Sequence, residues 1–165
     1  LELGCGTGST ALIHADFVGQ IFATDISQEM ISIAKNKADS QEIQNIKFIR
    51  SSVEEFESGE ANYDMILSLN LLHLISDRES ALGKIFSLLK PGGFFISSTV
   101  CAADKMWFMR PIVPVMQWFG LAPHFEFLKA EQVSDEIHSA GFGIKESWCH
   151  GKSNSLFVIA RKSMN

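Results

Sequence analysis

Three glycines behind an acidic residue carry the strongest chemical signal in the sequence. Gly4, Gly6 and Gly8 follow Glu2 and a short apolar run. Glycine permits both a sharp turn from strand to helix and the close approach of a ligand to the backbone. The spacing is GxGxG rather than the GxGxxG of dinucleotide sites, because Ser9 stands where the third glycine would be. By itself the cluster fits either a nucleotide-type ligand or a plain tight turn.

An acid at the end of the next apolar run favours the ligand interpretation. Asp25 closes a predicted strand over 20–25 and lies 17 residues after Gly8. In open parallel sheets, ligands bind at the carboxyl ends of the strands, where an acid can accept hydrogen bonds from ribose hydroxyls. Asp25 could instead cap the following helix, but Ser27 is the better candidate for that cap. We therefore expect Asp25 to bind ribose.

The elements that must position these residues alternate between short apolar runs and segments with a helical period. Strands are predicted at 1–3, 20–25, 45–51, 63–69 and 94–99, the fourth as an apolar run covered on both faces. Helices are predicted from the Ser27 cap to about Ala38, from the Asp77 cap to Leu89, where 90–93 (Lys-Pro-Gly-Gly) end it, and over 130–140. This alternation predicts a parallel sheet wrapped by helices.

The last third of the chain has a different character. Residues 105–128 are rich in Trp, Phe, Met and Pro and follow no clean period. The segments 144–150 and 155–161 flank a Gly-Lys-Ser-Asn turn at 151–154, which predicts an antiparallel hairpin. Neither an internal repeat nor a linker divides the chain, so residues 1–165 are interpreted as a single domain.

Composition narrows the classes of protein further. The chain has 165 residues, with 14 Lys and Arg against 19 Asp and Glu, for a net charge of -5. This acidic balance argues against a dedicated nucleic-acid binder. The three cysteines are scattered without CxxC spacing, so neither a disulfide framework nor a metal site is expected. No apolar run approaches the length of a membrane span, and cytoplasmic localisation is the default expectation.

Four segments in this order and spacing resemble the class I S-adenosylmethionine-dependent methyltransferases, especially the small-molecule branch that includes ubiquinone and menaquinone biosynthesis enzymes. They are 1–8 (Leu-Glu-Leu-Gly-Cys-Gly-Thr-Gly), 24–30 (Thr-Asp-Ile-Ser-Gln-Glu-Met), 63–73 and 88–93. The resemblance covers residues 1 to about 100. It implies an α/β fold: a Rossmann-like, doubly wound, seven-stranded and mostly parallel sheet, with an antiparallel last strand and helices on both faces. It also implies S-adenosylmethionine as cofactor, and a helical segment upstream of Leu1.

The resemblance assigns the cofactor contacts residue by residue. The implied cofactor-binding residues are Glu2, Gly4, Gly6, Gly8, Asp25, Ile26, Met30, Ser52, Val53, Glu54, Leu69 and Asn70. The glycines would lie under the methionine part of the cofactor, with Glu2 holding the loop or the amino group. Ile26 and Met30 would pack against the adenine, and Leu69 and Asn70 would border the methyl group. Ser52 departs from the family, which commonly has an aspartate there.

Candidate general bases are His73, after the fourth predicted strand, and His124. His73 could equally be a structural histidine. In the family, the region after the fifth strand covers the substrate, so residues 104–128 are interpreted as a substrate lid. Their Trp and Met content suits a small apolar or aromatic acceptor. The alternative is that their side chains cover the end of the sheet or a dimer contact.

Three classes of function stay open at this point. The leading hypothesis is a methyltransferase that acts on a small molecule, as a monomer or homodimer, without nucleic acid as a partner. The second is a non-catalytic binding module with the same fold. The third is a nicotinamide-dependent oxidoreductase. Methylation of nucleic acid is disfavoured because 70–73 read Asn-Leu-Leu-His rather than the Asn-Pro-Pro-Tyr type of motif.

Overall fold

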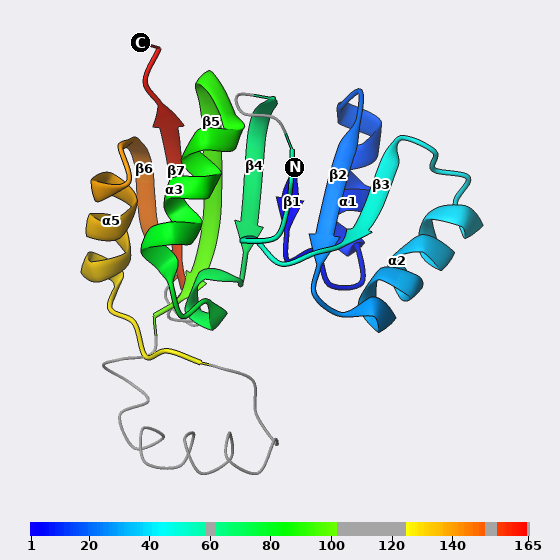
Figure 1. Cartoon of the computed structure of the whole chain (residues 1–165), viewed down its shortest axis with the longest axis horizontal. Coiled ribbons are helices and arrows are strands. Elements are labelled where there is room, and N and C mark those ends of the chain that lie inside the picture. Colours follow the sequence, from blue (N-terminus) through cyan, green and yellow to red (C-terminus); the bar gives the residue numbers. More distant parts are fainter. Residues whose placement is uncertain (59–61, 102–124, 151–154, 165) are drawn as a thin grey trace.

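The computed structural model describes residues 1–58, 62–101, 125–150 and 155–164. Within them the chain forms a seven-stranded sheet in the order β3-β2-β1-β4-β5-β7-β6 (Figure 1). The strands are β1 (Glu2–Leu3), β2 (Ile21–Asp25), β3 (Ile46–Arg50), β4 (Tyr63–Leu69), β5 (Leu89–Val100), β6 (Phe142–His150) and β7 (Ser155–Lys162). Strands β1 to β5 are parallel, whereas β7 is antiparallel to both β5 and β6. The predicted Rossmann-like sheet and its terminal hairpin are confirmed.

Two of the helices, α2 and α3, begin directly after the cap residues predicted from the sequence. They are α1 (Ser9–His14), α2 (Gln28–Ser40), α3 (Arg78–Leu88) and α5 (Ala130–Ser139), with short 3-10 helices at Ala15–Phe17 (η1) and Leu72–Leu74 (η2). The Met30 amide donates to Ser27 Oγ at 3.3 Å, and the Ser80 amide donates to Asp77 Oδ1 at 3.0 Å. Both predicted N-caps are therefore present, and each satisfies an amide that the first helical turn leaves unpaired.

Helices cover both faces of the sheet. One hydrophobic cluster joins α3 and α5 to strands that include β4, β5 and β7, and a second joins α1 and α2 to β2 and β3. In β2, Phe22 packs against the first cluster and Ala23 belongs to the second, as expected for side chains that alternate across a strand. In Figure 1, α3 and α5 lie in front of the sheet and α1 behind it.

Two details of the predicted strands differ from the structure. β5 starts at Leu89 rather than at Phe94, because Leu89 pairs with Tyr63 before the strand bulges over 90–93 and pairs again from Phe94. Gly92 takes the left-handed turn inside this bulge, with φ +77°. The expectation that 63–69 is covered on both faces is wrong, since the Met65 side chain is 43% exposed. Tyr63, Ile66 and Ser68 of β4 are buried.

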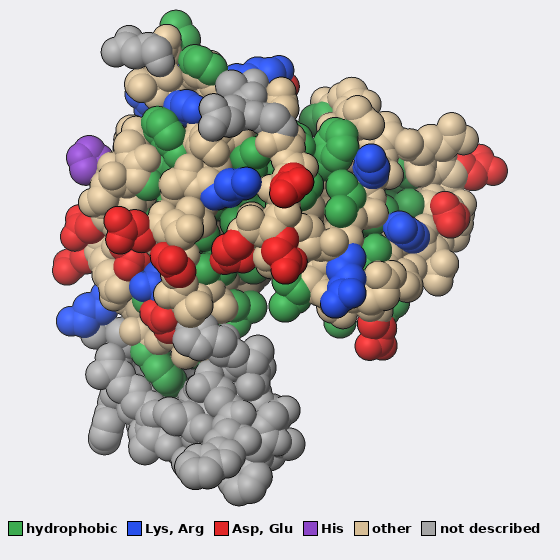
Figure 2. Space-filling view, viewed as in Figure 1, with side chains coloured by type: hydrophobic (Ala, Val, Ile, Leu, Met, Phe, Trp, Pro, Cys, Tyr) green, Lys and Arg blue, Asp and Glu red, His purple; other side chains and the backbone are tan. Residues whose placement is uncertain are grey.

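The surface agrees with the acidic composition. Figure 2 shows acidic side chains gathered over the face formed by α3 and α5, and no continuous basic stripe crosses the described part of this view. Of the helices in the described ranges, none is long and apolar enough to cross a bilayer. That nucleic acid is not a partner stays a prediction.

Candidate cofactor and acceptor site

The glycine loop joins β1 to α1 and is packed on one side and open on the other. Gly8 has φ +74°, and a Cβ on it would lie 2.8 Å from Ala34 Cβ and 2.9 Å from the Phe48 ring. At Gly4, with φ +70°, a Cβ would meet Leu71 Cδ1 at 2.9 Å. A Cβ on Gly6 would meet nothing within 4 Å. The backbone at Gly6 is therefore open to a ligand, while Gly4 and Gly8 seat the loop on the protein.

Asp25 connects this loop to the end of β2. Its Oδ2 accepts the Gly6 amide at 2.8 Å, and its Oδ1 accepts the Ser27 amide at 2.9 Å. A carboxylate oxygen can accept more than one hydrogen bond, so each keeps capacity for a hydroxyl donor. The competing interpretation of Asp25 as a helix cap is wrong, because Ser27 caps α2. Asp25 thus fixes the glycine loop and places a carboxylate at the carboxyl end of β2, beside that loop.

Glu2 is a buried carboxyl below the loop. Its side chain is 3% exposed, and Oε2 has no hydrogen-bond partner among the described residues. Burial raises the pKa of Glu2 to about 7, because an ionised carboxylate loses its hydration there. A buried oxygen without a partner costs free energy unless a donor reaches it. An ammonium group of a bound ligand would satisfy it.

The other predicted cofactor contacts lie at the carboxyl ends of β2, β3 and β4, which meet at one edge of the sheet, the lower one in Figure 1. Ile26 is 70% exposed, which leaves an apolar side chain available to a flat ligand. Met30 and Leu69 are half-buried. Asn70 is exposed and has φ +57°, a conformation that asparagine tolerates better than most residues.

The segment after β3 shows how Ser52 is used. Its Oγ accepts the Glu55 amide at 3.1 Å, so the hydroxyl already caps a turn. The Val53 side chain is buried in the core, and Glu54 is exposed. Where the family has an aspartate, this chain therefore has a turn-capping serine.

His73 lies on η2, directly after β4. It is 6% exposed, and Nδ1 has no partner among the described residues. Its ring meets Phe125 edge-to-face, with centroids 5.2 Å apart. Burial lowers the pKa of His73 below its usual 6.5, so the imidazole is neutral at physiological pH. The other candidate, His124, lies outside the described residues, as does most of the predicted lid (104–124).

Lys37 is a site residue that sequence reasoning missed. From α2, its Nζ donates to Thr7 Oγ1 at 2.9 Å and to Ser9 Oγ at 3.3 Å. These bonds connect α2 to the glycine loop. A lysine on a helix stripe carries no local signal for this contact, because the residues that it joins lie about 30 positions apart.

The described residues contain neither a disulfide nor a group of side chains arranged as metal ligands. Cys5, Cys101 and Cys149 are free thiols. The described ranges hold no cluster of three or more His, Cys, Asp or Glu side chains that could bind a metal ion.

A seven-stranded sheet of this order, with a glycine loop after β1 and an acid closing β2, defines the class I S-adenosylmethionine-dependent methyltransferase architecture. A family model described as a methyltransferase domain matches residues 1–157. The chain belongs to this methyltransferase domain family.

Individual relatives agree with that family. Ubiquinone biosynthesis O-methyltransferase from Acinetobacter baumannii (strain ACICU) is 26% identical over 151 residues, which are 88% of this chain and 64% of that enzyme. This chain therefore spans less than two thirds of that relative.

Solved structures share the fold at low identity. A S-adenosylmethionine-dependent methyltransferase from Aquifex aeolicus matches with a TM-score of 0.75 at 19% identity, over 97% of this chain and 79% of that one. The [4+2]-cyclase SpnF matches with a TM-score of 0.80 at 19% identity, over 99% and 75%. At such identity the likeness concerns the fold alone, and the cyclase is a reminder that one fold hosts different reactions.

Proposed function

We propose that this chain, as a single domain, binds S-adenosylmethionine along the edge formed by the glycine loop and Asp25, and transfers its methyl group to a small apolar or aromatic acceptor. The observation that carries the proposal is the hydrogen bond from Gly6 to Asp25. It sets an open stretch of glycine backbone beside a carboxylate with remaining acceptor capacity.

The donor set fits this cofactor. S-adenosylmethionine carries a sulfonium and an ammonium but no phosphate, so carboxylates and bare backbone suit it better than a basic cradle. Asp25 would accept the ribose hydroxyls, and the buried Glu2 would accept the ammonium group. The exposed Ile26 would pack against the adenine. Because Ser52 caps a turn, this site would lack a charged acceptor for the adenine amino group.

When bound, the cofactor supplies an activated methyl carbon: the acceptor's lone pair forms the new bond as the carbon–sulfur bond breaks, and that bond's electron pair stays on sulfur. The protein's own contribution is then alignment and exclusion of water. Neutral His73 can take a proton from an acceptor that must lose one. The half-buried rings of Phe125 and Phe127, 5.2 Å apart, supply an apolar surface beside it.

Isothermal titration calorimetry with S-adenosylmethionine and S-adenosylhomocysteine tests the proposal. We expect micromolar binding of both by the purified chain. Asp25→Asn keeps the shape but removes one acceptor and the charge, and should weaken binding about tenfold or more. Asp77→Asn is the matched control, since asparagine caps helices as well as aspartate does and α3 begins outside the proposed site. No binding at millimolar cofactor, or equal binding by both variants, contradicts the proposal.

The two other hypotheses are weaker. Family membership and Ser9 at the third fingerprint position both disfavour a nicotinamide cofactor. A non-catalytic module would retain cofactor binding or lose it, but would release no S-adenosylhomocysteine in the presence of any acceptor.

A further inference from the structure

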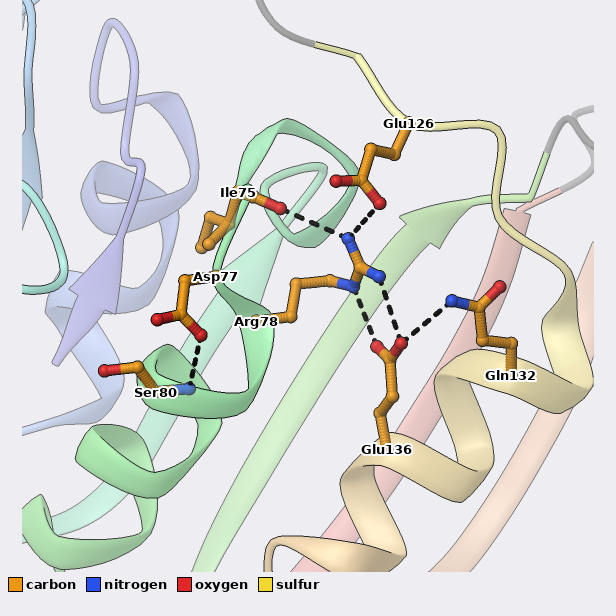
Figure 3. Close-up of polar contacts among 7 residues, drawn as sticks. All are labelled: Ile75, Asp77, Arg78, Ser80, Glu126, Gln132 and Glu136. Carbon is orange, nitrogen blue, oxygen red and sulfur yellow. Dashed lines mark hydrogen bonds and ion pairs between the residues drawn. The ribbon is translucent and has the colours of Figure 1, made fainter.

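Arg78, in the first turn of α3, joins two segments that are far from it in sequence (Figure 3). Its Nη1 donates to Glu126 Oε2 at 2.5 Å and to the Ile75 carbonyl at 3.2 Å. Its Nε and Nη2 donate to the two carboxylate oxygens of Glu136, on α5, at 2.8 and 3.0 Å. One guanidinium therefore holds α5 with one edge and residues 125–128 with another. We call 125–128 the return segment.

The Arg78 guanidinium is buried and held in one orientation, unlike a charged group on the surface. The Arg78 side chain is 9% exposed, against 32% for Glu126 and 27% for Glu136. A bidentate pair fixes the plane of the guanidinium as well as its position. The hydrogen bonds that Arg78 donates to Glu136 and Glu126 raise the pKa of Arg78, and Arg78 in turn lowers the pKa of Glu136. The Gln132 amide also donates to Glu136 at 2.9 Å, which holds that carboxylate on α5.

The return segment is also bound to His73. The Glu126 amide donates to the His73 carbonyl at 2.8 Å, and the adjacent Phe125 ring packs edge-to-face on the imidazole. Leu128, 1% exposed, anchors the other end of the segment in the hydrophobic core. Glu126 thus bonds to Arg78 with its side chain and to His73 with its backbone.

We propose that Arg78 is a positioning residue that acts through Glu126 to hold Phe125 over His73 and so shapes the acceptor side of the site. Glu136 fixes the Arg78 guanidinium to α5, and the guanidinium in turn binds Glu126 of the return segment. The inference rests on the proposed function for its catalytic meaning, but the link from Arg78 through Glu126 to Phe125 and His73 is testable without activity. If Arg78 only joined α3 to α5, substitution of Glu126 would leave the pKa of His73 unchanged.

The two carboxylates allow the alternatives to be separated. Glu126→Gln weakens only the bond to the return segment, whereas Glu136→Gln weakens only the bond to α5. Glu131→Gln, on an exposed position of α5 outside the cluster, is the matched control for the loss of one negative charge. Glu126→Asp keeps the charge but shortens the side chain, and serves if Glu126→Gln does not fold.

The readout is the titration of the His73 imidazole by NMR, together with hydrogen exchange of the amide at position 126. If the return segment loosens in Glu126→Gln, the pKa of His73 rises toward 6.5 and the amide exchanges about tenfold faster or more. Glu126→Asp changes both quantities in the same direction. Glu131→Gln leaves both unchanged, and Glu136→Gln changes them less than Glu126→Gln does.

An unchanged His73 titration and unchanged exchange in both Glu126 variants would overturn the inference, as would a larger effect of Glu136→Gln. Calorimetry with S-adenosylmethionine on the same Glu126 variants keeps the two proposals apart. Affinity for the cofactor like that of the unsubstituted chain is expected, because Arg78 acts on the acceptor side. Failure of the unsubstituted chain to bind cofactor would contradict the proposed function, while the NMR result would still decide the role of Arg78.

Discussion

At the scale of single residues, Glu2 has a carboxyl group whose charge depends on what binds beside it. Its pKa near 7 means that the ligand-free protein holds it partly protonated at neutral pH. An ammonium group beside Oε2 favours the ionised form, so binding would release a proton. A buried acid of this kind makes cofactor affinity a function of pH, whereas an exposed carboxylate would already be fully ionised.

We therefore predict that S-adenosylmethionine binds more tightly as pH rises from 6 to 8. Below the pKa of Glu2, affinity should fall by up to about tenfold per pH unit, since one proton must leave. Calorimetry at pH 6, 7 and 8 measures this slope. Glu2→Gln should bind S-adenosylmethionine more weakly, and its affinity should not change with pH. The same pH dependence in that variant would mean that Glu2 does not bind the ammonium group.

The same group predicts how the ligand-free protein responds to pH. An acid whose folded pKa, about 7, lies above its unfolded value of 4.5 stabilises the fold below pH 4.5 and loses that contribution as pH rises through 7. For a rise from 4.5 to about 7, at about 1.4 kcal/mol per pKa unit, the loss is at most ~3.5 kcal/mol. Urea denaturation at pH 5 and pH 8 should show Glu2→Gln gaining stability relative to the unsubstituted chain at the higher pH. An identical difference at both pH values would contradict the burial argument.

Gly8 gives a stability prediction that is independent of any ligand. An alanine Cβ there would overlap Ala34 and Phe48 and would require a left-handed backbone, so Gly8→Ala should cost about 2–4 kcal/mol. Gly83 is the control, because it lies within α3 and its Cβ would meet nothing within 4 Å. Gly83→Ala should stabilise by about 0.5–1 kcal/mol. Chemical denaturation compares them, and equal effects would refute the close packing of the loop.

At the scale of elements, the docking of α5 on α3 depends on the ionisation of Glu136. Arg78 lowers the pKa of this carboxyl, so its contribution is present above the unfolded value of 4.5 and is lost as pH falls through the lower folded value. Glu136→Gln should cost about 1–2 kcal/mol at pH 7 and less at pH 3. Denaturation curves at both pH values measure this. An equal cost at pH 3 would mean that packing, rather than charge, holds the helix.

Element boundaries show what sequence patterns can and cannot reveal. The caps at Ser27 and Asp77 and the hairpin before and after 151–154 were predictable, because each depends on residues next to one another in sequence. The start of β5 was not. Leu89 continues the apolar stripe of α3, and only its pairing with Tyr63 assigns it to a strand. Likewise, a continuous apolar run indicates a buried strand but not that Met65 stays exposed.

At the scale of the whole molecule, the strand–turn–helix around the glycine loop could be predicted from the sequence, whereas the Arg78 cluster could not. The glycines and Asp25 lie in motifs whose spacing reports a strand, a turn and a helix. The Arg78 cluster joins positions 48 and 58 residues apart, and no local pattern marks them. The contact between Lys37 and the loop is equally remote. Such pairings follow from how the sheet and its helices pack, and that packing is known only from the folded chain.

Because the candidate cofactor site draws on the ends of β1, β2 and β4, a ligand there should stabilise the whole fold rather than one loop. Binding to the folded state alone adds about 2.7 kcal/mol when the ligand is at 100 times its Kd. For a chain of this size, that corresponds to a rise in Tm of about 5–11 °C. Thermal unfolding with S-adenosylhomocysteine should show this shift, and NAD at the same concentration should not. Asp25→Asn, with affinity about tenfold weaker or more, should lose about half of the shift or more, while Asp77→Asn should keep it. A shift with NAD equal to that with S-adenosylhomocysteine would mean that the glycine loop recognises adenosine without regard to the group attached to it.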